Sequence, residues 1–293
     1  MKFNTLHSTL ILSLSFLLLV AGCGKTSLEE IPSYLKIDTI SISTTSSQGT
    51  ASQNVSDAWV YADNELIGAF ELPAKVPVLR SGSSVLSVFA GIKLNGINET
   101  RVQYPFYEQI RKTVTFERET ITELGHMKFA YVEGTKFAWK ENFEQGNLSL
   151  DPTARSEVNF VRTALPELAT AFPYETNEYA AKVVIAADTL VFECVSHDSF
   201  ELPTSGTSVF LELNYKSNNP FTVGLFVNST VTSQRSVLVV NPSSTWNKIY
   251  INFTPTVTNY PDANSFSVFF TAMKSTKDET AEILFDNIKL LHF

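Results

Sequence analysis

The chain has 293 residues, of which 44% are hydrophobic and 18% are charged. This composition is too apolar for a disordered chain and too evenly mixed for a protein with many membrane spans. Its 22 Lys and Arg against 30 Asp and Glu give a net charge of −8, which argues against nucleic acid as a partner. Two cysteines are too few for a disulfide scaffold or a four-cysteine zinc site.

The first residues predict an export signal. Residues 1–22 carry one basic side chain, Lys2, and an apolar run from Leu10 to Val20. A membrane-spanning helix needs about 20 residues, so this run is too short to span, and a basic start followed by a short apolar run is typical of a secretory signal. Its end, LVAGC, resembles the bacterial lipobox. The resemblance implies cleavage before Cys23, lipidation of that cysteine and a tether over residues 23–33; the alternative is an ordinary signal with an incidental cysteine.

The predicted location is the cell envelope. The chain resembles Bacteroidetes-type lipoproteins, which implies a lipid anchor in the outer membrane, and the residues after Cys23 leave the periplasmic and surface faces both open. If Cys23 is acylated, Cys194 has no intramolecular partner. Strand alternation places Cys194 on the same face as Phe192, which predicts a buried, inert thiol.

The first half of the mature chain predicts a β-sandwich. From Tyr34 the sequence alternates with period two and is rich in Val, Ile, Thr and Tyr, interrupted by a polar loop over residues 43–56. Seven short strands over residues 34–125 indicate an immunoglobulin-like sandwich. Within it, Val60 to Gly68 resembles PEGA and carboxypeptidase-regulatory-like modules. The strands are predicted over residues 35–42, 58–61, 65–70, 75–79, 85–91, 100–107 and 112–124.

The second half predicts a jelly roll over residues 136–293, after a boundary at residues 125–135. About nine strands in this length fit two packed sheets, so the fold class is all-β with two tandem sandwiches. At most a turn or two of helix is expected over residues 156–172, and Tyr104 to Tyr107 is expected to be an interdomain contact. The predicted strands are 136–143, 181–187, 189–195, 207–216, 221–227, 236–240, 246–253, 265–273 and 281–290.

Three segments of the second half resemble the galactose-binding-like jelly rolls that serve as carbohydrate-binding modules. These are the opening Glu141 to Gly146, the strand Trp246 to Ile251, and the closing Ile283 to Leu290. The resemblance implies a structural Ca²⁺ held by Glu144 and Asp286, with backbone carbonyls and waters completing its shell; the alternative is a solvated Glu144 and an Asp286 that bonds a turn. No other cofactor is expected.

Sugar recognition in such modules uses aromatic rings with nearby polar groups. The candidate rings are Phe172, Tyr174 and Tyr179 in one loop and Tyr260 in another; the alternative is that these rings cover the open ends of the sandwich. Two Asp-Thr-apolar tripeptides resemble the O-glycosylation acceptors of Bacteroidetes envelope proteins, which implies modification at Thr39 and Thr189.

The chain lacks the spacing of common catalytic motifs. It has no Gly-x-Ser-x-Gly elbow, no His-x-x-x-His and no Cys-x-x-Cys, so we expect a protein that is not an enzyme. The leading hypothesis is an envelope lipoprotein that binds a glycan through its C-terminal jelly roll. The alternative is a structural or assembly lipoprotein that contacts other envelope proteins.

Overall fold

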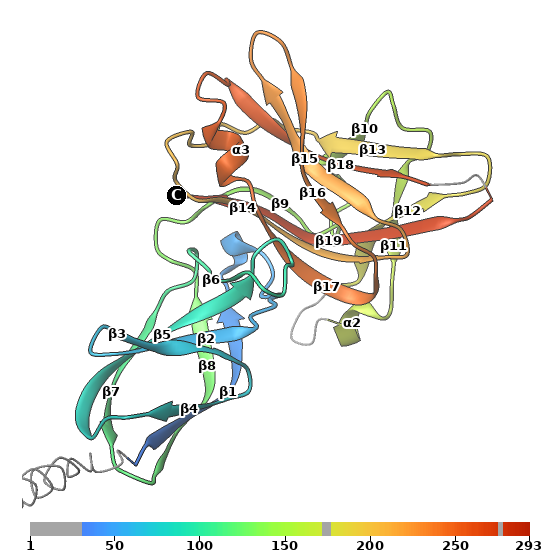
Figure 1. Ribbon diagram of the computed structural model, residues 1–293. Coiled ribbons are helices and arrows are strands. Elements are labelled where there is room, and N and C mark those ends of the chain that lie inside the picture. Colours follow the sequence, from blue (N-terminus) through green and yellow to red (C-terminus); the bar gives the residue numbers. More distant parts are fainter. Residues whose placement is uncertain (1–30, 172–176, 275–277) are drawn as a thin grey trace, which may run out of the picture.

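The protein is an all-β chain of two sandwich domains, as the sequence predicts. The structure is a computed structural model that describes residues 31–171, 177–274 and 278–293. Figure 1 shows the two domains one after the other, with the C-terminus at their junction. No helix in these ranges is long and apolar enough to cross a membrane.

The first domain packs two sheets, ordered β4-β1-β8 and β3-β2-β5-β6, with β7 also paired to β5. The loop between β1 and β2 carries a short 3-10 helix, Ser46–Gln48. β1 pairs with β8 in parallel, which joins the first strand of the domain to the last. The strands are β1 (Ser33–Ser43), β2 (Asp57–Ala62), β3 (Glu65–Glu71), β4 (Ala74–Val78), β5 (Gly82–Lys93), β6 (Arg101–Gln103), β7 (Ile110–Phe116) and β8 (Ile121–Ala130).

The end of this domain differs from the prediction. The single strand expected over residues 112–124 is two strands, β7 and β8, separated by a turn after Phe116. Gly125 does not end β8: it adopts φ 62° at an irregularity in the pairing with β1, and the strand continues to Ala130. A glycine can take this left-handed conformation without strain and form a bulge inside a strand. The first domain therefore extends to Ala130, past the predicted limit at residue 125.

The second domain is a jelly roll of two antiparallel sheets. One is ordered β10-β13-β18-β15-β16, and the other β11-β12-β19-β14-β17, with β9 also paired to β19. Two short helices, α2 (Leu168–Ala171) and α3 (Thr254–Thr258), interrupt the strands. The strands are β9 (Lys136–Glu141), β10 (Leu150–Pro152), β11 (Phe160–Ala164), β12 (Tyr179–Ile185), β13 (Val191–Ser196), β14 (Val209–Ser217), β15 (Phe221–Asn228), β16 (Ser233–Val240), β17 (Ser243–Asn252), β18 (Ser265–Met273) and β19 (Ala281–His292).

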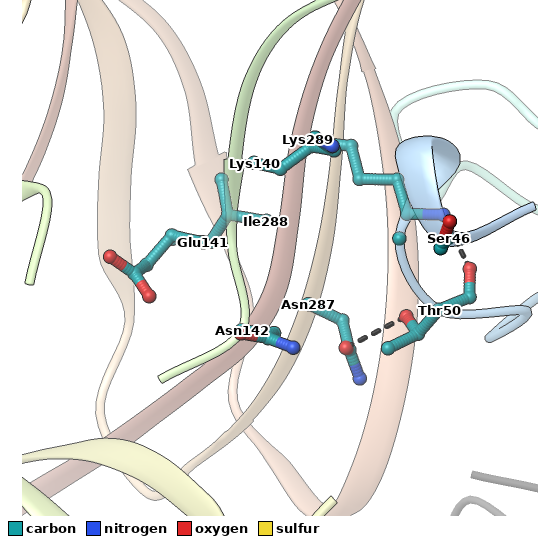
Figure 2. Close-up of a pocket in the computed structure, with 9 residues that line it drawn as sticks. Ser46, Thr50, Lys140, Glu141, Asn142, Asn287, Ile288 and Lys289 are labelled. Carbon is teal, nitrogen blue, oxygen red and sulfur yellow. Dashed lines mark hydrogen bonds between the residues drawn. The ribbon is translucent and has the colours of Figure 1, made fainter. Parts of the chain in front are cut away.

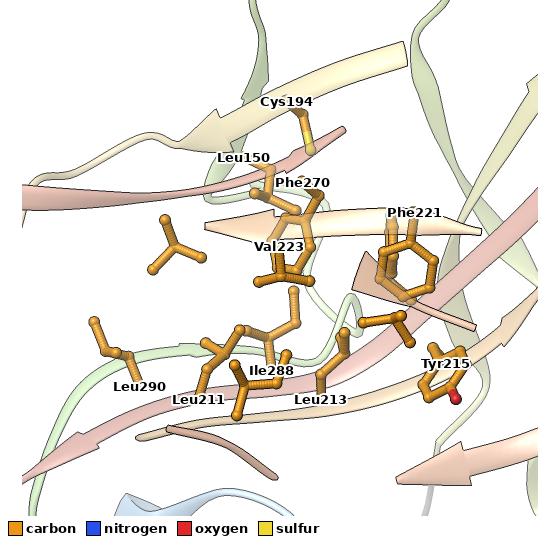
Figure 3. Close-up of a cluster of buried hydrophobic side chains, with 14 of the residues drawn as sticks. Leu150, Cys194, Leu211, Leu213, Tyr215, Phe221, Val223, Phe270, Ile288 and Leu290 are labelled. Carbon is orange, nitrogen blue, oxygen red and sulfur yellow. The ribbon is translucent and has the colours of Figure 1, made fainter. Parts of the chain in front are cut away.

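The jelly-roll core lies between its two sheets and is rich in phenylalanine. Alternate residues of β14 and β15, such as Leu211, Leu213 and Val223, point into it (Figure 3). Cys194 is fully buried there, which confirms its predicted burial, and burial raises the pKa of its thiol.

The first-domain core continues into the jelly roll. Phe210, Tyr250 and Leu291 lie on the outer face of the β14-β17-β19 sheet and belong to the same buried cluster as the first-domain residues. The ring of Tyr104 lies 5.6 Å from Phe210 and 4.8 Å from Tyr250, centroid to centroid. The predicted interdomain contact at Tyr104 to Tyr107 is therefore confirmed, and the first domain covers the outer face of the jelly roll over β14, β17 and β19.

Candidate functional site

A buried charged cluster fixes the two domains to each other. Glu212 of β14 is fully buried and lies 2.6 Å from the ammonium of Lys248 on β17. The hydroxyls of Tyr104 and Tyr131, both from the first domain, donate to the Glu212 carboxylate at 2.8 and 2.9 Å. Lys248 in turn donates to the carbonyl of Ser52 at 2.6 Å. These bonds span the interface and satisfy the buried charges.

The titration of this cluster follows from its burial. Burial alone disfavours the Glu212 carboxylate, but the nearby Lys248 and Lys289 ammonium groups and the hydrogen bonds outweigh it, so the pKa of Glu212 lies below its ordinary value. Burial first, and the Glu212 charge second, raise the pKa values of Tyr104 and Tyr131 well above the ordinary range. The cluster is thus one ionised acid among neutral tyrosines, a structural joint in the interface.

A polar hollow lies beside this joint. It has a volume of about 230 Å³ and is lined by the β1–β2 loop of the first domain and by β9 and β19 of the jelly roll. Figure 2 shows Thr50 hydrogen-bonded to Asn287, and Lys289 donates to the Thr50 carbonyl at 2.5 Å. Three of its polar residues, Thr50, Asn287 and Lys289, thus bond each other. Its volume is also below the roughly 300 Å³ and more that is usual for ligand pockets, so we assign this hollow to the domain interface and not to a ligand site.

The opening and closing motifs of the jelly roll converge at the start of β12. Glu144 accepts hydrogen bonds from the backbone N–H groups of Glu178 and Tyr179, at 2.9 and 3.0 Å. Asp286 is fully buried and accepts a bond from the Asn177 side-chain amide at 2.8 Å. The two carboxylates that the resemblance pairs therefore both contact the same short segment, residues 177–179.

These contacts do not favour a calcium ion. The groups that face Glu144 and Asp286 in these bonds are N–H donors, whereas calcium needs six to eight oxygen ligands. Among the described residues no group of three or more His, Cys, Asp or Glu side chains is placed to hold a metal. Calcium at Glu144 and Asp286 stays a prediction that a binding experiment must test.

The rings expected from the sequence do not form a common platform in the described residues. Phe172 and Tyr174 lie outside these residues. Tyr179 is half-buried, and the guanidinium of Arg162 stacks 3.2 Å from its ring centroid. Tyr260 is half-buried against the jelly-roll core, with Arg235 5.2 Å from its ring centroid. The contacts of Tyr179 and Tyr260 fit rings that cover the ends of the sandwich.

The outer face of the jelly-roll sheet β10-β13-β18-β15-β16, the five-stranded sheet of that domain, carries a network that the sequence analysis missed. Glu193 of β13 points away from the core, yet its side chain is only 1% exposed. Its carboxylate accepts hydrogen bonds from Thr153 at 2.8 Å, from Gln234 of β16 at 2.8 Å, and from Arg155 at 3.3 Å. Arg155 also donates to Gln234 at 3.0 Å. We call Thr153, Arg155, Glu193 and Gln234 the outer-face network.

Two aromatic rings lie beside the outer-face network. Phe226 of β15 pairs in register with Gln234 and is half-buried. Its ring centroid lies 5.1 Å from that of Phe269 on β18, which is fully buried. Phe269 covers Gly224: a Cβ at that glycine would lie 2.5 Å from the ring. Two sequence signals could have located this face. They are Gly224 in the middle of a strand and Glu193 between apolar strand residues.

The remaining predicted positions are placed as follows. Thr39 is exposed on β1 and bonds His126 at 2.8 Å, and Thr189 is half-buried in a turn, where it donates to the Ala186 carbonyl. Cys23 lies outside the described residues. Modification at Thr39 and Thr189 and lipidation at Cys23 therefore stay predictions.

Comparisons with known proteins give distant structural likenesses only. No family model and no curated protein matches the chain. A structure of carbohydrate-binding modules from the β-sandwich superfamily is 12% identical, with 80% of this chain and 84% of that one covered and a TM-score of 0.35. A family 11 carbohydrate-binding module from Clostridium thermocellum is 15% identical over 54% of this chain and 96% of that one, with a TM-score of 0.37. The K3 adhesin domain of Lys-gingipain from Porphyromonas gingivalis is 14% identical over 54% and 99%, with a TM-score of 0.36.

Proposed function

We propose that this protein is a non-catalytic, lipid-anchored envelope protein that binds carbohydrate on the outer face of the five-stranded sheet of its jelly roll. The observation that carries the proposal is the outer-face network, in which the buried Glu193 carboxylate holds Arg155 and Gln234 in place beside the Phe226 ring. The first domain covers the opposite face of the jelly roll over β14, β17 and β19, whereas no described residue of the buried cluster that joins the two domains lies on the five-stranded sheet.

The chemistry of this face suits a polyhydroxylated ligand. A sugar ring has an apolar C–H face, which packs on an aromatic ring, and an edge of hydroxyls, which need donors and acceptors. Phe226 supplies apolar surface, while Gln234 and Arg155 supply polar groups on the same sheet face. Because Glu193 already orders Gln234 and Arg155, little side-chain entropy is lost when a ligand binds.

The binding proposal is tested with a glycan array and polysaccharide pull-down of the purified protein, with and without calcium. Phe226→Ala and Gln234→Ala should each weaken binding several-fold or more, while the control Val161→Ala, at an exposed residue of the other sheet, should not. Loss of binding in Tyr179→Ala or Tyr260→Ala alone would instead favour the rings predicted from the sequence. Oligosaccharides recovered after incubation should be unchanged in mass, as expected of a protein that is not an enzyme.

The membrane anchor needs its own experiment. Cys23 precedes the described fold, which begins at Ile31, by a short polar segment that can serve as a tether. More than one acyl chain on Cys23 would give stable attachment, since each buried CH₂ contributes about 0.8 kcal/mol. Fatty-acid labelling should mark the wild type but not Cys23→Ala. Intact-mass analysis of the native protein should then report any glycan on Thr39 or Thr189.

A further inference from the structure

The first domain carries a second aromatic surface, on the outer face of its β3-β2-β5-β6 sheet. Along β2, Ala58, Val60 and Ala62 are fully buried, so the alternate residues Trp59 and Tyr61 point outward, where both remain partly exposed. Phe89 of β5 pairs in register with Trp59, is partly exposed, and places its ring 5.4 Å from that of Tyr61. We call Trp59, Tyr61 and Phe89 the aromatic strip.

The Trp59 ring lies against a glycine. A Cβ at Gly91 would be 2.8 Å from both Cδ1 and Nε1 of the indole, so the ring occupies the space that a side chain at this position would take. The Cδ1–Nε1 edge of the indole therefore packs against Gly91 while the residue stays partly exposed. The Nε1 of Trp59 is buried and has no hydrogen-bond partner in the described chain. An unsatisfied buried N–H is unfavourable for folding, so this ring placement calls for another explanation.

Fixed polar groups flank the aromatic strip. Gln103 of β6 donates to the Tyr61 hydroxyl at 2.7 Å. Arg101 donates to the Asp57 carboxylate at 2.5 Å and lies 3.8 Å from Glu71. Two carboxylates thus face one guanidinium, so this part of the face carries ordered polar groups and an excess negative charge, which disfavours an anionic ligand.

From this geometry we propose that the aromatic strip is a second carbohydrate-binding surface, specific for a neutral polysaccharide chain. Aromatic rings on neighbouring strands can pack on the apolar faces of pyranose units, and the side chains of Gln103 and Arg101 can bond their hydroxyls. Leu66 and Ala69 of β3, both exposed and opposite Tyr61 and Trp59, extend the strip toward the sheet edge. This site lies in a different domain from the outer-face network and does not depend on it. Two surfaces on one protein raise the avidity for a long chain when both engage it at once.

Affinity electrophoresis of the purified protein tests the proposal, with xylan, galactomannan and a β-glucan as neutral probes and pectin as an anionic one. Trp59→Ala and Phe89→Ala should weaken retardation by a neutral probe about tenfold, whereas Trp59→Phe, which keeps a ring, should retain most of it. Unfolding midpoints of the variants establish that the first domain remains folded. Phe226→Ala, which removes the aromatic ring of the proposed jelly-roll site, is the variant compared with Trp59→Ala.

The outcomes separate the two surfaces. Binding that falls in Trp59→Ala and still falls further in the double variant with Phe226→Ala supports the aromatic strip. Binding that falls only in Phe226→Ala overturns the strip and leaves the jelly-roll site intact, and the reverse result overturns the jelly-roll site alone. Of the three tryptophans, Trp139 is buried in the jelly-roll core and Trp246 lies on β17 of the same domain, so an emission change caused by a ligand on the aromatic strip should disappear in Trp59→Phe. An emission change that survives this substitution, or retardation by pectin alone, contradicts the proposal.

Discussion

The substitution Glu212→Gln removes the negative charge from the centre of the domain junction while keeping the size of the side chain. The wild-type carboxylate is fully buried, lies 2.6 Å from the Lys248 ammonium and accepts bonds from Tyr104 and Tyr131. With glutamine in this position, Lys248, whose side chain is 2% exposed, is left as a buried cation without its counter-ion. A lone buried charge is far less stable than a buried pair.

The expected loss is large. Breaking one partner of a buried ion pair typically costs about 3–5 kcal/mol, a major part of the roughly 5–15 kcal/mol that stabilises a folded protein. For a chain of this size each kcal/mol lowers Tm by roughly 2–4 °C, so the variant should melt about 6–20 °C below the wild type. The matched control is Glu123→Gln, which breaks the exposed pair between Glu123 and Lys36 at 3.2 Å and should cost less than about 1 kcal/mol.

Chemical denaturation followed by tryptophan fluorescence measures both variants. The double variant Glu212→Gln/Lys248→Met removes both charges and should recover most of the loss, because no cation is then stranded at Lys248. A Glu212→Gln variant within about 1 kcal/mol of the wild type would refute the reasoning, as would additive effects in the double variant.

The pH dependence of stability gives an independent check. The pKa of Glu212 in the folded protein lies below its ordinary value of 4.5, so the folded state binds its proton less readily than the unfolded state. The stabilisation is therefore complete above about pH 4.5 and is lost as the pH falls through the lower, folded-state pKa. The wild type should lose stability over this acidic range more steeply than Glu212→Gln, and equal slopes would contradict the assignment.

Three further predictions follow from local contacts. Gly224→Ala should destabilise the jelly roll by about 1–3 kcal/mol in thermal unfolding, because its Cβ would lie 2.5 Å from the Phe269 ring and 2.2 Å from a backbone oxygen. The hydrogen bond from His197 to Asp151 raises the pKa of His197 above its ordinary value of 6.5, so an NMR titration should show that pKa fall in Asp151→Asn. The Cys194 thiol should react with an aromatic disulfide reagent in denaturant but not in the native protein; fast native reaction would contradict its burial.

Much of the fold could be predicted from the sequence because strand patterns are local. Alternation in segments such as residues 221–227 and 265–273 requires only that one face of a strand be buried, so these strands and the jelly roll follow from the chain itself. The Tyr104 to Tyr107 segment was likewise apolar enough to predict a contact between domains. The end of β8 was not predictable, because Gly125 is compatible with a boundary or a bulge until its partner strand is known.

The candidate sites depended on the tertiary structure. Glu193 and Gln234 are distant in sequence and meet only because β13, β18, β15 and β16 lie side by side in one sheet. Trp59 in turn reads as an ordinary strand residue until its ring is seen against Gly91 on the neighbouring strand. The sequence by itself determined the all-β class and the strand faces, since both follow from the period of the chain. Which outer face is closed and which polar groups meet on the open ones was decided only by sheet order and domain packing, which bring together residues that the sequence keeps far apart.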